Sequence, residues 1–266
     1  MTGASRGIGA AIACAIAADG WPVGVNYRAD AEGAARVVGA IEAAGGLAVA
    51  LQGDVTSAGD VARLFETLEE RHVRVLVLVN CAGVRSDRLF LTMTDDDWHR
   101  VVDTNLNGAY RTIRRALPAM TRARFGRVVS VGSIIGSRPL PGLANYSVSK
   151  AALEALTRTV AIEVARRGVT INVVAPGLVE TELTSDVATL ADEASRTIIP
   201  SRRAGTTEDV AACVRFLASP DAGYVTGTTV VVDGGLSASL FPLTRTARPE
   251  PRQPGIEEPQ TQEATA

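Results

Sequence analysis

Three side chains in the middle of the sequence could together transfer a proton to a carbonyl oxygen. Tyr146 and Lys150 lie four residues apart, a spacing that puts both on one face of a helix, one turn from each other. An ammonium group beside a phenol favours the phenolate, so Lys150 is expected to make Tyr146 a better acid near neutral pH. Such a tyrosine can give a proton to a ketone oxygen or take one from an alcohol. Ser133, thirteen residues earlier, could add a hydroxyl donor to the same oxygen.

The N-terminal segment has the composition of a phosphate-binding turn, and its presence supports a catalytic role for Ser133, Tyr146 and Lys150. Alone, Tyr-x-x-x-Lys is a weak signal, because such a pair is usually just exposed on a helix surface. Residues 2–9, Thr-Gly-Ala-Ser-Arg-Gly-Ile-Gly, lead directly into an apolar, alanine-rich helix at residues 10–18. Glycines let the backbone approach a pyrophosphate closely, and the helix offers unpaired N–H groups and the positive end of its dipole. The spacing Gly-x-x-x-Gly-x-Gly differs from the more common Gly-x-Gly-x-x-Gly dinucleotide fingerprint.

The elements that must position these residues alternate regularly along the chain. Strands are predicted at residues 23–27, 47–52, 75–79, 127–132, 169–175 and 228–232. Helices are predicted at residues 10–18, 31–44, 57–71 with Ser57 as N-cap, about 95–122 with a bend near Pro118, 145–167 and 207–218. This alternation predicts one α/β domain over residues 1–240, a Rossmann-type doubly wound parallel sheet in three α/β/α layers. Ligands of such sheets bind at the carboxyl ends of the strands.

The order of the motifs resembles the short-chain dehydrogenase/reductase family. The glycine-rich turn is followed by Asn80-Cys81-Ala82-Gly83, then by Asn105, Ser133, the Tyr146/Lys150 pair and Pro176-Gly177. The resemblance extends from Thr2 to about Leu236. It implies reversible hydride transfer between a nicotinamide cofactor and a ketone, on a catalytic group made of Asn105, Ser133, Tyr146 and Lys150.

The resemblance also implies a role for each of these residues. Tyr146 would donate the proton, and Ser133 would polarise the carbonyl. Lys150 would assist Tyr146 and bind the nicotinamide ribose, and Asn105 would position a water that links Lys150 to bulk solvent. The residues expected to hold the cofactor, apart from Tyr146 and Lys150, are Thr2, Gly3, Ser5, Arg6, Gly7, Ile8, Gly9, Tyr27, Arg28, Asp54, Val55, Asn80, Ala82, Gly83, Pro176, Gly177, Val179 and Thr181.

The end of the strand at residues 23–27 indicates which nicotinamide cofactor is used. NAD-preferring members of such folds hold the adenosine ribose with an acidic residue near this position. Here Tyr27 is followed by Arg28, with Arg6 in the glycine-rich turn, and Asp30 falls past the strand end. Because arginine matches phosphate geometry, the pair favours the 2′-phosphate of NADP(H). The alternative is that Arg28 is only a solvated loop charge.

Within the family, the stretches Asn26-Tyr27-Arg28, Asp87-Arg88-Leu89 and Ser130-Val131-Gly132-Ser133 resemble those of the β-ketoacyl-acyl-carrier-protein reductases and their polyketide relatives. This similarity implies NADPH-dependent reduction of a 3-oxoacyl thioester, with Arg127 and Arg167 docking an acidic carrier protein near the mouth of the site. Both arginines could instead be ordinary charges at element ends. Residues 182–204 would form a substrate lid. A second possibility is a ketoreductase or secondary alcohol dehydrogenase for a polyketide, sugar or steroid-like ketone. A third is an inactive NADP(H)-binding regulatory paralogue, which the complete catalytic set disfavours.

Both ends of the chain depart from the expected pattern. The family places a central strand immediately before Thr-Gly, and only Met1 precedes it here. Because loss of a central strand would be costly, we expect the natural start to lie upstream, with Met1 standing for a valine codon read as a start. The alternative is a genuinely truncated, weakly folding chain. Residues 241–266, rich in Pro, Glu and Gln, are expected to be a disordered tail.

Composition narrows the class of protein further. The chain has 266 residues, is 46% hydrophobic and carries a formal net charge of −2, which fits a large core and gives no reason to expect nucleic acid. No apolar run approaches the ~20 residues that span a bilayer. Its three cysteines lack metal-ligand spacing, so no metal is expected and we predict a cytoplasmic protein. The family resemblance implies a homotetramer built through the long helices and the last strand.

Overall fold

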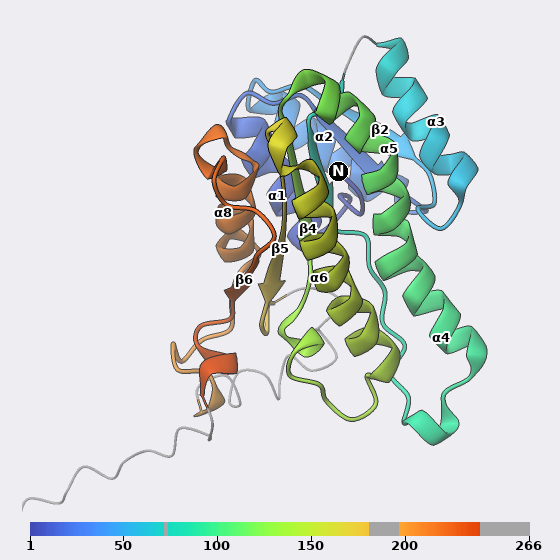
Figure 1. Ribbon diagram of the computed structural model, residues 1–266, viewed down its shortest axis with the longest axis vertical. Coiled ribbons are helices and arrows are strands. Elements are labelled where there is room, and N and C mark those ends of the chain that lie inside the picture. Colours follow the sequence, from blue (N-terminus) through green and yellow to red (C-terminus); the bar gives the residue numbers. More distant parts are fainter. Residues whose placement is uncertain (72–73, 181–196, 240–266) are drawn as a thin grey trace, which may run out of the picture.

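The computed structural model describes residues 1–71, 74–180 and 197–239, and within them parallel strands alternate with helices (Figure 1). The strands are β1 (Val23–Tyr27), β2 (Ala48–Gln52), β3 (Val77–Asn80), β4 (Gly126–Val131), β5 (Val169–Pro176) and β6 (Thr229–Val232). β1 pairs with β2, and a separate ladder runs in the order β3-β4-β5-β6, all parallel. The prediction of a Rossmann-type parallel α/β fold is confirmed.

Residues 1–4 lie between the two groups of strands. The Thr2 N–H donates to the Val79 carbonyl on β3 at 2.9 Å, and the Asn26 N–H on β1 donates to the Met1 carbonyl at 3.0 Å. The Ala4 N–H in turn donates to the Asn26 carbonyl at 2.9 Å. A short extended segment therefore joins β1 to β3 at the point where the resemblance predicts a full strand, and it leads directly into the glycine-rich turn.

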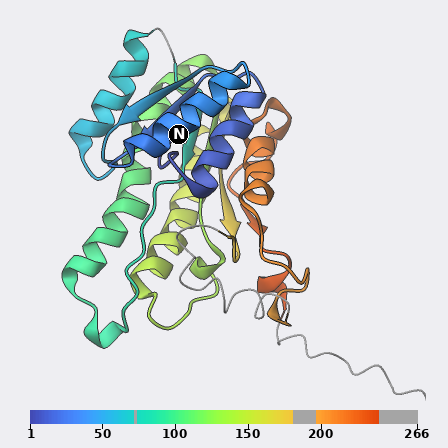
Figure 2. The ribbon, with the colours of Figure 1, turned by 180° about the vertical axis from the view of Figure 1, so that it is seen from behind.

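The helices cover both faces of the strands. The α-helices are α1 (Gly7–Ala18), α2 (Ala31–Ala43), α3 (Ala58–Glu70), α4 (Asp95–Val102), α5 (Gly108–Ala123), α6 (Ala144–Val164) and α8 (Thr207–Ala218). α3, α5 and α6 lie on the side that faces the viewer in Figure 1, whereas Figure 2 brings α1 and α2 forward on the opposite side. Ser57 caps α3 as predicted, since its side chain accepts the Asp60 N–H at 3.2 Å.

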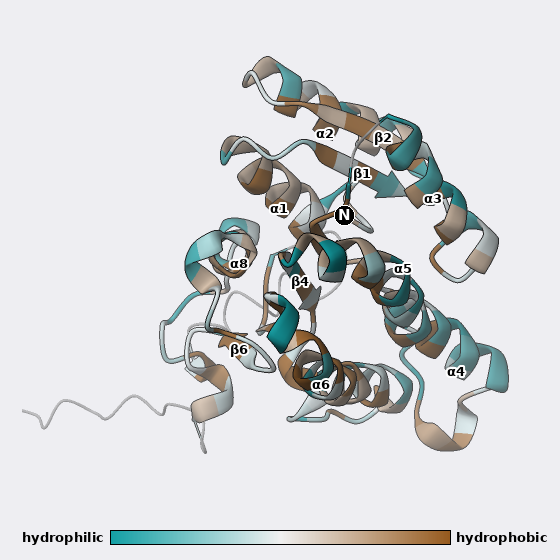
Figure 3. Ribbon diagram, turned by 45° about the horizontal axis from the view of Figure 1, so that its top comes forward, coloured by the Kyte–Doolittle hydropathy of each residue, from teal (hydrophilic) through white to brown (hydrophobic). Residues whose placement is uncertain are grey.

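Each face of the strands has its own apolar core, because successive side chains of a strand point to opposite faces. Val79 and Val129 belong to a cluster with α1, α2 and α8, whereas their neighbours Leu78 and Val128 belong to a cluster with α3, α5 and α6. Every residue of β4 and β5 is buried, as expected of parallel strands covered on both sides. Hydrophilic residues (teal in Figure 3) occupy the outer sides of α4 and α5.

The single helix predicted near residues 95–122 is interrupted, but not at the proline. A π-helical turn, η2 (Asp103–Asn107), separates α4 from α5, and Pro118 lies within α5. Such turns are frequent at functional sites because the extra residue re-aims the side chains around it. Here the turn carries Asn105, which is 2% exposed. None of the described helices is long and apolar enough to span a membrane.

Candidate active site

The carboxyl end of β4 and the first turns of α6 bring Ser133, Tyr146 and Lys150 into one region. Lys150 is 5% exposed, and its Nζ donates to the carbonyl of Val131, the last residue of β4, at 2.7 Å. The same Nζ lies 5.5 Å from the centre of the Tyr146 ring. Ser133 follows β4 by two residues, and its Oγ accepts the Ile135 N–H at 3.2 Å. The ammonium group is therefore held between the end of the strand and the tyrosine ring.

Asn105 reaches the same region from the π-helical turn. Its Oδ1 accepts the Val84 N–H at 2.8 Å, and its Nδ2 donates to the Val84 carbonyl at 3.1 Å and to Ser149 Oγ at 3.2 Å. A Cβ on Gly83 would stand 3.4 Å from Asn105 Oδ1 and 3.8 Å from Lys150 Nζ. This glycine therefore leaves the space beside Asn105 and Lys150 open.

Ser149 was not among the residues singled out from the sequence, and the structure makes it part of the support of the site. Its hydroxyl accepts from Asn105 and donates to the Tyr146 carbonyl at 2.7 Å. Ser149 precedes Lys150 by one residue, and the side chain is fully buried. Its position in the Tyr-x-x-x-Lys segment was the only signal that could have drawn attention to it.

The glycine-rich turn packs against the end of β3 so closely that side chains are excluded. Gly3 has φ +60°, and a Cβ there would come within 2.6 Å of the Ala82 Cα. A Cβ on Gly9 would be 2.0 Å from the Gly3 carbonyl oxygen. Thr2 Oγ1 accepts the backbone N–H groups of Cys81 and Ala82 at 3.1 and 3.2 Å. Arg6 is the N-cap residue of α1, and its side chain makes no capping hydrogen bond. The first backbone N–H groups of a helix have no partner within the helix and can donate to a ligand.

The residues predicted to bind the adenosine part of the cofactor include Arg28 and Asp54, which lie just past the ends of β1 and β2. Arg28 is largely exposed, and its guanidinium lies 3.8 Å from the carboxylate of Asp54, which accepts the Thr56 N–H at 2.8 Å. One carboxylate that the sequence reasoning set aside also lies here. Asp30 accepts the Gly33 N–H at 2.9 Å and a hydrogen bond from Ser5, and these contacts, with nearby Arg36 and Arg6, lower its pKa.

The predicted nicotinamide side lies where β5 ends. The Gly177 N–H donates to the Val232 carbonyl of β6 at 3.0 Å, and a Cβ on Gly177 would come within 2.6 Å of Asp233. Val179 forms a parallel bridge to Gly205 and is buried. Thr181 and residues 182–196 of the predicted lid lie outside the described residues, as does the predicted tail at 241–266.

Arg127, one of the two arginines predicted to dock a carrier protein, is buried at the start of β4. Arg127 is 4% exposed, and its guanidinium donates to backbone carbonyls of Ser219, Gly126, Gly168 and Pro220. Arg167 is exposed, but it follows the far end of α6, about 21 Å along the helix axis from Lys150. Both arginines thus lie at the amino ends of the strands, not at the mouth of this chain's site.

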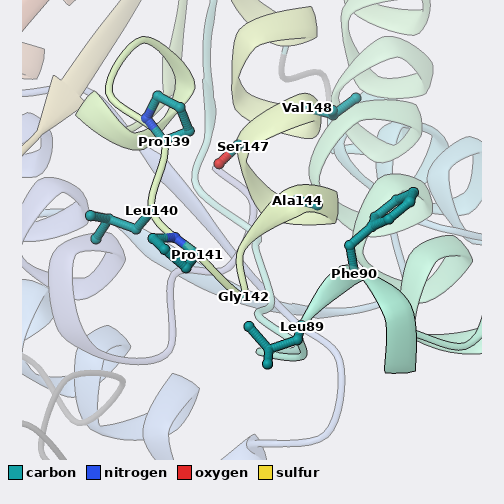
Figure 4. Close-up of a pocket in the computed structure, with 9 residues that line it drawn as sticks. All are labelled: Leu89, Phe90, Pro139, Leu140, Pro141, Gly142, Ala144, Ser147 and Val148. Atoms are coloured by element: carbon teal, nitrogen blue, oxygen red, sulfur yellow. The ribbon is translucent and has the colours of Figure 1, made fainter.

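An apolar pocket of about 490 Å³ lies next to the start of α6 (Figure 4). Three of its lining residues, Ala144, Ser147 and Val148, come from the first turns of α6, and neither Tyr146 nor Lys150 is among its lining residues. Its other lining residues are Leu89, Phe90, Pro139, Leu140, Pro141 and Gly142.

Comparisons with known proteins identify the family of the chain. Residues 3–237 match the family model described as enoyl-(acyl carrier protein) reductase. The chain is 44% identical to a 3-oxoacyl-[acyl-carrier-protein] reductase of Synechocystis, over 89% of this chain and 95% of the relative. It is 41% identical to a protein of the same name from Pseudomonas aeruginosa, over 90% of this chain and 96% of the relative. A crystal structure of a "putative gluconate dehydrogenase" from Agrobacterium tumefaciens superposes with a TM-score of 0.87 at 31% identity, covering 90% and 95% of the two chains.

The chain belongs to the short-chain dehydrogenase/reductase family. It is an oxidoreductase that acts on a ketone or the corresponding alcohol, and its fold and family imply a nicotinamide cofactor.

Proposed function

We propose that this protein catalyses the NADPH-dependent reduction of a 3-oxoacyl thioester, carried on an acyl carrier protein or on coenzyme A, to the 3-hydroxyacyl thioester. The observation that carries the proposal is the placement of Lys150 between the end of β4 and the Tyr146 ring, with Ser133 following the same strand. The names of relatives that cover nearly the whole chain support the substrate class.

The residues present fit a dinucleotide. The close packing at Gly3 and Gly9 leaves bare backbone in the turn, and the start of α1 offers the N–H groups that bind a pyrophosphate. When bound, the reduced nicotinamide supplies a hydride to the carbonyl carbon. The exposed Arg28 would hold the 2′-phosphate that distinguishes NADPH from NADH.

The protein's own residues handle the charge that develops on the carbonyl oxygen. Ser133 would donate a hydrogen bond to this oxygen, and Tyr146 would give it the proton that completes the alcohol. The Lys150 ammonium would stabilise the phenolate left behind, and Asn105 would hold a water through which the proton is replaced. Because Lys150 is buried and anchored to Val131, its charge acts from a fixed position.

A second candidate is a dehydrogenase for a sugar acid or another secondary alcohol. The observation that favours it is the structural similarity to the Agrobacterium protein. The chemistry and the roles of Ser133, Tyr146 and Lys150 are the same in this case, and only the substrate differs.

The test compares the parent protein with Tyr146→Phe and with a matched control, Tyr110→Phe, which removes an exposed phenol on α5. NADPH oxidation is followed by absorbance with acetoacetyl-coenzyme A, and NADPH binding by fluorescence. We expect turnover in the parent and in Tyr110→Phe, and a loss of at least about 100-fold in Tyr146→Phe with NADPH binding retained. NADPH binding without thioester turnover, together with oxidation of gluconate in the presence of NADP⁺, would support the second candidate instead.

A further inference from the structure

Asn145, the residue immediately before Tyr146, is fully buried in the first turn of α6 and uses every polar atom of its side chain. Its Oδ1 accepts the backbone N–H of Tyr146 at 2.7 Å. Its Nδ2 donates to the Ser86 carbonyl at 3.1 Å and to the Asp97 carbonyl at 3.0 Å. The first N–H groups of a helix have no partner within the helix, and Leu143 at the N-cap provides none from its side chain. Asn145 therefore satisfies the amide of Tyr146.

The orientation of the Asn145 amide is determined by its surroundings. Two carbonyl oxygens can be matched only by the NH₂ group, and the Tyr146 N–H only by the oxygen. A side chain of another type cannot make the same three bonds. Aspartate keeps the acceptor but turns a second carboxylate oxygen towards the two carbonyls, and alanine makes none of the bonds.

Asn145 and Asn105 hold the same segment from its two ends. Asn105 binds both backbone groups of Val84, and Asn145 binds the carbonyl of Ser86. A third bond, from the Arg88 N–H to the Gly142 carbonyl at 2.9 Å, ties this segment to the residues just before α6. The segment at residues 84–88 thus connects the π-helical turn to the start of α6.

The backbone of Tyr146 is held on both sides by these contacts. Its N–H is bound by Asn145, and its carbonyl accepts the hydroxyl of Ser149, which is itself bound by Asn105. Lys150, one turn further along, is fixed to Val131. A change at Asn145 would release the tyrosine end of this turn while the lysine end stays anchored.

We propose that Asn145 is a positioning residue for Tyr146, setting the phenol at the place where it meets the carbonyl oxygen above the fixed Lys150. The proposal rests on the proposed role of Tyr146 as the proton donor. Asn145 does not touch the reacting atoms. It acts through the first turn of α6 and through the segment at residues 84–88.

The experiment measures Asn145→Ala and Asn145→Asp in the full chain, beside two controls on the same helix. Ser147→Ala removes a buried hydroxyl without a hydrogen-bond partner. Leu153→Ala truncates a core side chain that is 1% exposed, and the cavity it leaves lowers stability without touching this network. Thermal unfolding is recorded for all four variants, so that kinetic effects are compared at known stability.

Three readouts separate positioning from a general loss of structure. We expect kcat for acetoacetyl-coenzyme A to fall about 10- to 100-fold in both Asn145 variants, while the Kd of NADPH stays within about twofold of the parent. The primary isotope effect on kcat with deuterated NADPH should rise, because proton and hydride transfer become rate-limiting. Hydrogen exchange at the Tyr146 amide should accelerate in Asn145→Ala and stay close to the parent in Asn145→Asp, which keeps the acceptor.

The outcomes are distinct. Parent-like kcat and isotope effect in both Asn145 variants would overturn the proposal, even if their melting temperatures fell. A parent-like kcat in Asn145→Asp alone would also overturn it, because the bonds to Ser86 and Asp97 would then be dispensable. A fall in kcat of the same size in Leu153→Ala would also overturn the proposal, because lost stability alone would then explain the lower kcat of the Asn145 variants. Failure of the proposed function would appear differently, as absence of thioester turnover in the parent, while the exchange of the Tyr146 amide would still report the contact.

Discussion

Arg28 lies just past the end of β1, with 64% of its side chain exposed and its guanidinium 3.8 Å from Asp54. If it binds the 2′-phosphate, Arg28→Ala should raise the KM for NADPH about 10-fold, which corresponds to one charged hydrogen-bonded contact. The KM for NADH should change little. Arg63→Ala, which removes an arginine that is equally exposed on α3, serves as the control. Equal losses with both cofactors would contradict a phosphate-binding role.

Cys81 combines an active-site position with an unreactive thiol. Burial raises the pKa of Cys81 to about 11, although the nearby Lys150 ammonium acts in the opposite direction. Since only the thiolate is nucleophilic, roughly one thiol in a thousand is ionised at pH 8. We expect iodoacetamide at pH 8 to modify the exposed Cys14 well before Cys81, as measured by peptide mass spectrometry. A denatured sample, in which all cysteines react, calibrates the assay, and rapid labelling of Cys81 in the folded protein would refute the expectation.

At the residue scale, the sequence identified the candidate catalytic side chains by their type and order. It did not identify the residues whose hydrogen bonds hold them in place. Tyr146, Lys150 and Asn105 could be found because the motif order is specific, and the structure brings them into one region. Ser149 and Asn145 could not be found in this way, because serine and asparagine in a helix usually bond to nearby backbone. Their partners are 44 and 59 residues away in the chain.

At the element scale, α4 begins with a capping box whose acidic member serves two purposes. The Asp97 side chain accepts from Thr94 at 2.8 Å and from Ser86 at 2.6 Å, which ties the start of α4 to the segment at residues 84–88. These hydrogen bonds, first that of Ser86 and then those of Thr94, lower the pKa of Asp97 to about 2, with Arg88 contributing.

The depressed pKa of Asp97 predicts a defined pH dependence of stability. A carboxyl group whose folded-state pKa is lowered stabilises the fold above its unfolded pKa of ~3.9 and loses this effect as pH falls through the folded value. The melting temperature of Asp97→Ala should therefore lie below that of the parent at pH 5 to 7, and the gap should close between about pH 4 and pH 2. Asp96→Ala, an exposed neighbour in the same turn, should show no such convergence. A gap that stays constant down to pH 2 would rule out the ionised capping contact as its cause.

Element boundaries were predictable wherever local chemistry sets them. The capping box of Thr206 and Asp209 begins α8 at the predicted residue, and the valine-rich runs at β3 and β4 were recognisable as buried strands. The π-helical turn at η2 was not predictable from the local sequence pattern, and its Asn105 bonds to Val84 and Ser149, which are 21 and 44 residues away in the chain. Gly108 packs onto Val55 so closely that a Cβ would come within 2.7 Å.

At the scale of the whole molecule, the two layers of helices meet the strands on two separate apolar clusters. Among the polar side chains that join distant parts of the described chain, Arg127 makes four hydrogen bonds to backbone carbonyls. Its guanidinium joins the start of β4 to the turn before β5 and to the end of α8, through carbonyls up to 93 residues away. It also lies 4.4 Å from the centre of the Phe125 ring. The sequence shows the charge of this arginine but not its burial.

Because Arg127 is buried and hydrogen-bonded, we expect its substitution to lower the free energy of unfolding. Substitution of a docking residue would instead raise the KM for the carrier-protein substrate. Arg127→Lys should lower the free energy of unfolding by about 2–4 kcal/mol, because a single ammonium group cannot reach all the carbonyls that the planar guanidinium satisfies. Burial lowers the pKa of Arg127 but leaves this strong base charged, so the loss should be the same from pH 6 to pH 9. Arg167→Lys and Arg167→Ala, at an exposed position, should change stability by less than about 0.5 kcal/mol. Denaturant unfolding gives these values, and KM for acyl-carrier-protein and coenzyme A thioesters gives the second readout. A selective rise in KM for the carrier-protein substrate in Arg127→Lys, with unfolding unchanged, would support the predicted docking role and refute the structural one.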